Sequence, residues 1–77
     1  MDYTPYYAEA VIAINENIRN GEEFFLKELF PLYRWNELTN YQKRDFGRFF
    51  SSKVSDNNIP SVIKCESVKG PTKYRKQ

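Results

Sequence analysis

Apolar residues in the first twenty positions recur at steps of three and four. They share one face of a helix and are Tyr7, Val11, Ile14 and Ile18. Thr4 can serve as the N-cap, and Pro5 suits the first helical position, where a missing N–H costs nothing. Asn20 and Gly21 tolerate the left-handed backbone that ends many helices. We therefore predict a helix over about residues 5–19.

The next segment holds short apolar runs between charged residues. Phe24 and Phe25 suit a short strand contact. We predict a short helix over about residues 26–31, closed by Pro31 because proline disfavours helical geometry in the residue before it. Trp35 then belongs to the turn that leads to the next helix.

Residues 39–55 show a second helical pattern. Thr39 and Gln42 match a capping box, in which each side chain satisfies a free backbone N–H of the other residue. The apolar stripe starts at Tyr41 or Gln42 and continues with Phe46, Phe49, Phe50 and Val54. The other side holds Asn40, Lys43, Arg44, Gly47, Arg48, Ser51 and Ser55. We predict a helix over about residues 39–55, with the apolar stripe in the core.

Gly47 stands in the middle of this predicted helix. Glycine there costs about 1 kcal/mol relative to alanine, so we expect another group to approach the helix closely. That group is either a neighbouring segment of the chain, which is the commoner cause, or a ligand.

The last part of the chain has the pattern of a β-hairpin. Strand-favouring residues flank a turn sequence, Val68-Lys69-Gly70-Pro71. Alternation places Ile63 and Cys65 on one face and Val62, Lys64 and Glu66 on the other. We predict a hairpin over about residues 61–76 and expect Cys65 to be a small core residue.

The order of these elements is typical of a winged-helix domain, in which the hairpin forms the wing. We therefore expect one α+β domain over residues 1–77, winged-helix-like, with three helices followed by a C-terminal β-hairpin.

Four groups of residues also carry a family resemblance. They are Gly21-x-x-Phe24-x-Leu26-Lys27-x-Leu29-Phe30, Trp35-x-x-Leu38, Arg44-x-Phe46-Gly47-Arg48-x-Phe50 leading to Val54, and Tyr74-Arg75-Lys76. Through them, over about residues 20–76, the chain resembles a family of small single-domain bacterial and phage proteins of unknown function, described as winged-helix-like. Phe46-Gly47 replaces the Leu-Gly pair of that pattern, one apolar residue for another. The resemblance implies the fold and no mechanism.

Composition excludes several function classes. The chain has one cysteine, Cys65, and no histidine, so an intramolecular disulfide, a usual zinc site and a nucleophile activated by histidine are all excluded. We therefore expect no enzyme, no cofactor, no metal and no small-molecule substrate. The chain shows no signal peptide and no apolar run of membrane-spanning length. We expect a cytoplasmic protein without a membrane partner.

Charge is divided unevenly along the chain. Residues 1–40 carry three basic and seven acidic side chains, whereas residues 41–77 carry nine basic and three acidic ones. Such asymmetry indicates a basic working surface in the second half, or a solvated basic face with its acidic complement elsewhere.

A basic third helix and wing favour binding to duplex DNA, as in a small regulator from a phage or mobile element. The candidate contacts are Asn40, Lys43, Arg44 and Arg48 on the helix and Lys69, Lys73 and Arg75 on the hairpin. Arginine or lysine pairs with guanine and asparagine with adenine. If the six basic residues all meet phosphates, the slope of log affinity against log salt is on the order of −5.

The alternative is a protein–protein interaction module that binds a host protein or a second copy of the chain. It is favoured by the acidic first half and by Tyr3, Tyr6, Tyr33 and Trp35, since tyrosine and tryptophan are enriched at interface hot spots. We expect the three tyrosines to be exposed, and the alternative role of all these aromatic residues is core packing. For Trp35, core packing is the commoner role.

Overall fold

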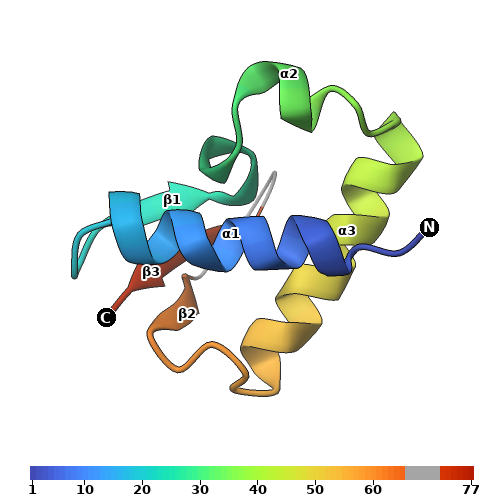
Figure 1. Ribbon diagram of the computed structural model, residues 1–77. Helices are drawn as coiled ribbons and strands as arrows, with labels where there is room; N and C mark the ends of the chain where they lie inside the picture. The colour runs from blue at the N-terminus through green and yellow to red at the C-terminus, as the bar shows by residue number, and fades with distance from the viewer. Residues whose placement is uncertain (66–71) are drawn as a thin grey trace.

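The computed structural model describes residues 1–65 and 72–77 and confirms the α+β class (Figure 1). Its elements are, in order, α1 (Thr4–Asn17), β1 (Glu23–Phe25), the 3-10 helix η1 (Leu26–Leu29), α2 (Leu32–Trp35), α3 (Asn40–Ser55), β2 (Val62–Cys65) and β3 (Lys73–Lys76). The described residues thus form three α-helices and one three-stranded antiparallel sheet. The predicted turn at residues 68–71 lies outside the described residues.

Both ends of α1 differ from the prediction. Tyr3 occupies the N-cap position in place of Thr4, and the Asp2 carboxylate accepts the Thr4 N–H at 3.0 Å. At the other end, Ile18 leaves the helix in an extended conformation. The Lys76 ammonium supplies the cap, because it donates to the carbonyls of Ile14 and Ile18 at 3.0 and 2.9 Å.

Pro31 separates two short helices where the sequence predicts one. The first, η1, ends at Leu29 and is a 3-10 helix whose start is held by the Glu28 carboxylate, which accepts the Phe25 N–H at 2.7 Å. The second, α2, begins directly after Pro31, whose fixed φ suits the start of a helix. The sequence analysis missed α2, since four residues are too few for a periodic pattern.

A single ion network ties α2 to α1. The Arg34 guanidinium on α2 contacts the carboxylates of Glu9 and Glu37, and one of its nitrogens lies 3.2 Å from the Tyr6 hydroxyl. The same guanidinium lies 4.0 Å from the centre of the Tyr6 ring. The paired carboxylates raise the pKa of Arg34 further above its ordinary value. This network places α2 beside the N-terminal half of α1.

The third helix begins as predicted. Thr39 Oγ1 accepts the Gln42 N–H at 3.1 Å, and Gln42 Oε1 accepts the Thr39 N–H at 2.9 Å. Phe46, Phe50 and Val54 are buried. Tyr41, a candidate for the start of the apolar stripe, is exposed.

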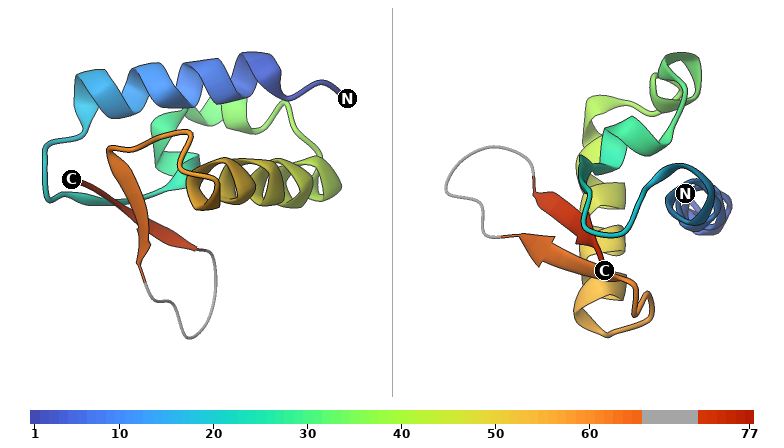
Figure 2. Two further views of the ribbon diagram at one scale, coloured as in Figure 1. Left: turned by 90° about the horizontal axis from the view of Figure 1, so that it is seen from below. Right: turned by 90° about the vertical axis from the view of Figure 1, so that its left-hand side faces the viewer.

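The predicted hairpin is extended into a sheet by β1. Its strand order is β1-β3-β2, so the last strand of the chain is the central one. Phe24 pairs with Tyr74 across β1 and β3, and Lys64 pairs with Tyr74 across β2 and β3. Figure 2 shows β2 and β3 extending away from α1, past the side of α3.

An aromatic core joins the helices to the sheet. Phe46 and Phe50 have no exposed surface, and the Phe50 ring meets the Tyr74 ring edge-on at 5.0 Å. Tyr3 and Tyr6 are buried against Phe46. The expectation that these two tyrosines are exposed is therefore wrong.

Cys65 is not the core residue that the sequence analysis expected. Its side chain is half-buried, whereas Val62 on the other face of β2 is buried. The Cys65 thiol donates to the Glu23 carboxylate at 3.5 Å.

Candidate nucleic-acid interface

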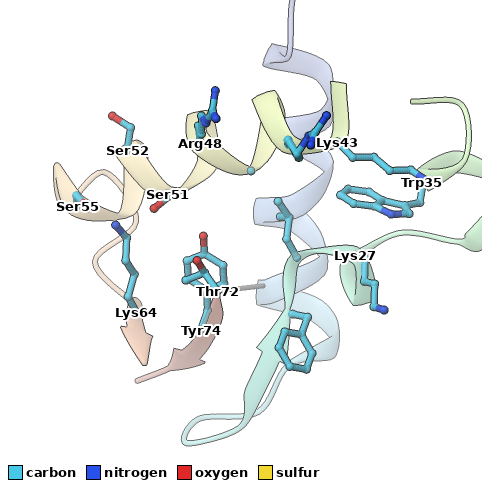
Figure 3. Close-up of a pocket in the computed structure, with 14 residues that line it drawn as sticks. Lys27, Trp35, Lys43, Arg48, Ser51, Ser52, Ser55, Lys64, Thr72 and Tyr74 are labelled. Atoms are coloured by element: carbon cyan, nitrogen blue, oxygen red, sulfur yellow. The ribbon is translucent and has the colours of Figure 1, made fainter. Parts of the chain in front are cut away.

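A groove of about 720 Å³ lies between the exposed side of α3 and the hairpin (Figure 3). We call it the α3–hairpin groove. Its α3 wall consists of Lys43, Arg44, Gly47, Arg48, Ser51, Ser52 and Ser55. The hairpin contributes Lys64, Thr72 and Tyr74, and the segment between residues 25 and 35 contributes Phe25, Leu26, Lys27 and Trp35.

The spacing of residues on α3 explains this wall. Lys43, Gly47, Ser51 and Ser55 follow each other at steps of four and form one line along the helix. Arg44, Arg48 and Ser52 form the neighbouring line. The capping box at Thr39 sets where the helix begins, and the buried stripe on its opposite side holds both lines toward the groove.

Positive charge dominates the groove. Among the described lining residues, five are cationic, namely Lys27, Lys43, Arg44, Arg48 and Lys64, and none is a carboxylate. Arg44 and Arg48 are exposed and make no ion pair with the residues that the structure describes. Clustered like charges in a concave surface raise the local potential and attract a polyanion.

Acidic side chains of the first half have partners away from the groove. Glu9 and Glu37 bind Arg34, and Glu23 contacts Lys73. Glu22 and Glu28 accept backbone N–H groups. These carboxylates therefore do not neutralise the groove cations.

Asp45 adds a negative charge to α3, but on a different flank. It lies with Tyr3 and Lys53 in a separate hollow on the surface. Burial raises the pKa of the Tyr3 phenol, and the nearby Asp45 carboxylate raises it further. Arg48 borders this hollow as well as the groove, so it is the groove cation nearest to Asp45's flank.

One end of the groove is closed by an aromatic stack. The rings of Trp35 and Phe30 stack with their centroids 5.7 Å apart. Lys43 Nζ lies 5.9 Å from the Trp35 ring centroid and donates to the Asn36 side-chain oxygen at 3.1 Å. Lys43 is therefore held in place at this end of the groove (Figure 3).

Tyr74 connects the groove to the core. Its ring is buried between Phe24 and Phe50. Burial raises the pKa of the Tyr74 phenol, and the Ser51 hydroxyl on α3 partly offsets this. The phenol therefore stays uncharged at neutral pH and adds no negative charge to the groove.

The structure divides the residues that the sequence predicts as DNA contacts. Lys43, Arg44 and Arg48 line the groove together. Asn40 is exposed at the first position of α3 and is not part of the lining. Lys69 lies outside the described residues.

Lys73 and Arg75 are not among the residues that line the groove. Tyr74 between them points to the core and the groove, and successive strand residues point to opposite faces. Lys73 Nζ also lies 3.8 Å from the Glu23 carboxylate. These two cations therefore do not share a wall with Arg44 and Arg48.

Two groove cations, Lys64 and Lys27, were missed by sequence reasoning. Lys64 is the pairing partner of Tyr74 and shares its face. If Tyr74 had been identified as the buried residue of its strand, the pairing of the two strands would have placed Lys64 on the same face. Lys27 lies in η1, where no pattern in the sequence indicates the direction of its side chain.

Gly47 has no close neighbour in the groove wall. A Cβ added to it would meet no atom of the described residues within 4 Å. The expectation of close packing by another segment is therefore not supported in the described part of the chain. The other expected cause of a glycine at this position is a ligand that approaches the helix.

None of the helices among the described residues has the length and apolar character to cross a bilayer. The same residues contain no group of three or more potential metal ligands.

A family model matches residues 9–74 of the chain, and its description is Domain of unknown function (DUF1413). No curated protein and no solved structure matches the chain significantly.

Proposed function

The chain belongs to this family of unknown function, and from its own geometry we propose that it binds duplex DNA through the α3–hairpin groove and the exposed side of α3. The observation that carries the proposal is a concave surface whose lining, in the part of the chain that the structure describes, has five cations and no carboxylate. Phosphates provide most of the affinity of proteins for DNA, and lysine and arginine are their usual partners.

The dimensions of α3 suit this role. Its 16 residues span about 24 Å, and the major groove of duplex DNA admits an α-helix. In a helix-turn-helix arrangement, residues in the N-terminal half of the second helix reach base edges. Asn40 is exposed in that half of α3 and can donate to bases, while Lys43, Arg44 and Arg48 meet phosphates.

The hairpin takes the position of a wing beside α3 in this proposal. Its groove-facing contact is Lys64, whereas Lys73 and Arg75 add to the positive field from the outer face of the sheet. The proposed role is that of a small winged-helix-like regulator of phage or mobile-element type, acting in the cytoplasm without catalysis.

Salt dependence of binding tests the proposal. If the five groove cations meet phosphates, log affinity for a short duplex falls against log salt with a slope of about −4.5. Titration by fluorescence anisotropy at several salt concentrations measures this slope. No binding at the lowest salt concentration, or affinity independent of salt, would overturn the proposal.

A second candidate function is a protein interface on α2. Leu32 and Tyr33 are 75% and 74% exposed, and no residue of α2 is buried. Exposed aromatic and large aliphatic residues are common at interfaces. Burial of Tyr3 and Tyr6 removes two of the tyrosines on which the sequence argument for this function rests.

Sedimentation equilibrium tests this second candidate as self-association. A dimer that dissociates in the Leu32→Ser, Tyr33→Ser variant, while the fold is retained, would place the interface on α2. A wild-type chain that stays monomeric at high concentration would exclude a homodimer.

A further inference from the structure

Gly47 occupies the wall of the α3–hairpin groove for no reason internal to the described chain. Its φ is not positive, so the backbone does not require glycine. A Cβ there would meet no described atom within 4 Å, so packing does not require it either. Alanine is the better helix former at such a position. As far as the described residues go, nothing covers the backbone of α3 at Gly47, so a partner can reach it there.

Hydrogen-bond donors surround this open surface. Lys43 and Ser51 lie one turn before and after Gly47, and Arg44 and Arg48 lie on the neighbouring line of the helix. Phosphate oxygens accept hydrogen bonds from all four of these side chains, and contacts to phosphate and sugar account for at least half of protein–DNA hydrogen bonds.

The opposite wall of the groove offers further donors. Lys64 and Thr72 project from the hairpin toward α3, beside the buried Tyr74 ring (Figure 3). A chain of phosphates lying at Gly47 thus has cations and hydroxyls on both sides. An acidic protein would meet the same charges. A phosphodiester strand fits better, because its phosphates repeat along its length and can contact donors on both walls of the groove.

We infer that one strand of the bound duplex lies in the α3–hairpin groove with its sugar–phosphate backbone packed directly on α3 at Gly47. This inference rests on the proposed function and names the part of the DNA that fills the groove. The missing Cβ lets the strand come close enough for Lys43, Arg44 and Arg48 to reach its phosphates. Any side chain at residue 47 would hold the strand away from the helix.

Two substitutions of Gly47 and one control test the inference. Gly47→Ala and Gly47→Leu add a small and a large side chain to the groove wall. Ala8→Leu adds a leucine at an exposed position of α1, outside the groove. Affinities are measured by fluorescence anisotropy for two short duplexes of unrelated sequence, and thermal unfolding is followed for every variant.

We expect Ala8→Leu to bind each duplex with the same affinity as wild type does. Gly47→Ala should weaken binding about fivefold and Gly47→Leu should weaken it more, because added bulk separates packed surfaces. Both duplexes should be affected by the same factor, since their backbones are alike. The unfolding midpoint of Gly47→Ala should rise by about 5 °C, because alanine favours the helix.

Each other result overturns the inference in a distinguishable way. If wild type binds and Gly47→Leu binds with the same affinity, the strand does not pack on Gly47, and the proposed function still stands. A loss confined to one duplex would place base edges there instead of backbone. A lower unfolding midpoint in Gly47→Ala would mean that the chain itself packs on Gly47. No binding by wild type would overturn the proposed function as well.

Discussion

Lys76 shows how one side chain near the end of the chain supports a helix formed by its first residues. Its ammonium donates to two carbonyls at the C-terminal end of α1, where the helix dipole also favours a positive charge. This arrangement connects the central strand β3 to α1. Nothing in the spacing of the sequence indicates it, because residues 14 and 76 meet only in the folded chain.

We predict that Lys76→Met lowers the free energy of unfolding by about 1–2 kcal/mol, since hydrogen bonds to a charged group are lost while the apolar stem is kept. Lys73→Met is the matched control, because the Lys73 ammonium contacts the half-exposed Glu23 carboxylate at 3.8 Å and the Phe25 ring at 5.5 Å from its centroid instead of helix carbonyls. Its cost should be about 0.5 kcal/mol or less. Urea denaturation of both variants measures the difference, and equal costs would contradict the capping role.

Cys65 offers a second test at the residue scale. Burial, together with the Glu23 carboxylate, raises the pKa of the Cys65 thiol. A raised pKa leaves less thiolate at a given pH, and the thiolate is the reactive form. Cys65 should therefore react with iodoacetamide at pH 8 more slowly than a free cysteine does.

Glu23→Gln should accelerate this reaction, because it removes the negative charge beside the thiol and so lowers the Cys65 pKa. Glu16→Gln, which changes an exposed carboxylate on α1, is the control and should leave the rate unchanged. The rate of alkylation from pH 7 to pH 10 gives the pKa directly. Identical pH profiles for wild type and Glu23→Gln would contradict the assigned cause.

At the element scale, the caps distinguish what the sequence predicts from what it does not. The Thr39 and Gln42 capping box is a local motif, and the structure confirms it. Threonine is a common N-cap residue, but α1 begins one residue earlier than predicted, so Tyr3 occupies the N-cap position in place of Thr4. Burial of the Tyr3 ring in the aromatic core is a tertiary effect that overrides the local preference.

These two threonines provide a matched pair of substitutions. Thr39→Ala should lower the free energy of unfolding by about 1 kcal/mol, because α3 loses its N-cap. Thr4→Ala should change it by about 0.5 kcal/mol or less, since the Thr4 side chain caps nothing. Thermal and urea denaturation measure both values. A larger loss in Thr4→Ala than in Thr39→Ala would contradict the assignment of the caps.

Elements with a periodic pattern were predictable, whereas the short helix α2 was not. The helices α1 and α3 and the strands β2 and β3 follow from amphipathic spacing and turn residues. The helix α2 follows a proline and spans four residues, so periodicity cannot reveal it. Lys73 and Arg75 were predicted as DNA contacts together with the α3 cations, but only the burial of Tyr74 between them shows that they do not line the groove.

At the scale of the whole molecule, the strand order gives the hairpin two roles. Because β3 is central, the hairpin is part of the core as well as one wall of the groove. Tyr74 is buried and Lys76 caps α1, both from this strand. A chain ending before β3 should therefore lose its fold, so the role of the hairpin in binding has to be tested by substitution instead of truncation.

The distribution of arginines over the molecule allows DNA binding in the α3–hairpin groove to be distinguished from attraction to the rest of the surface. Arg44 and Arg48 line the α3–hairpin groove, whereas Arg19 and Arg75 are exposed outside it. Changing either pair to glutamine removes the same net charge. The two double variants therefore separate a local contact from a general attraction between a basic protein and DNA.

The most direct measurement is the affinity of these two variants for one duplex across a range of salt concentrations. Arg44→Gln, Arg48→Gln should reduce the magnitude of the salt slope by about 2 and weaken binding roughly tenfold or more near 0.1 M salt, because two phosphate contacts are lost. Arg19→Gln, Arg75→Gln should leave the slope within about 0.5 of wild type. Equal losses in the two variants would contradict binding in the α3–hairpin groove.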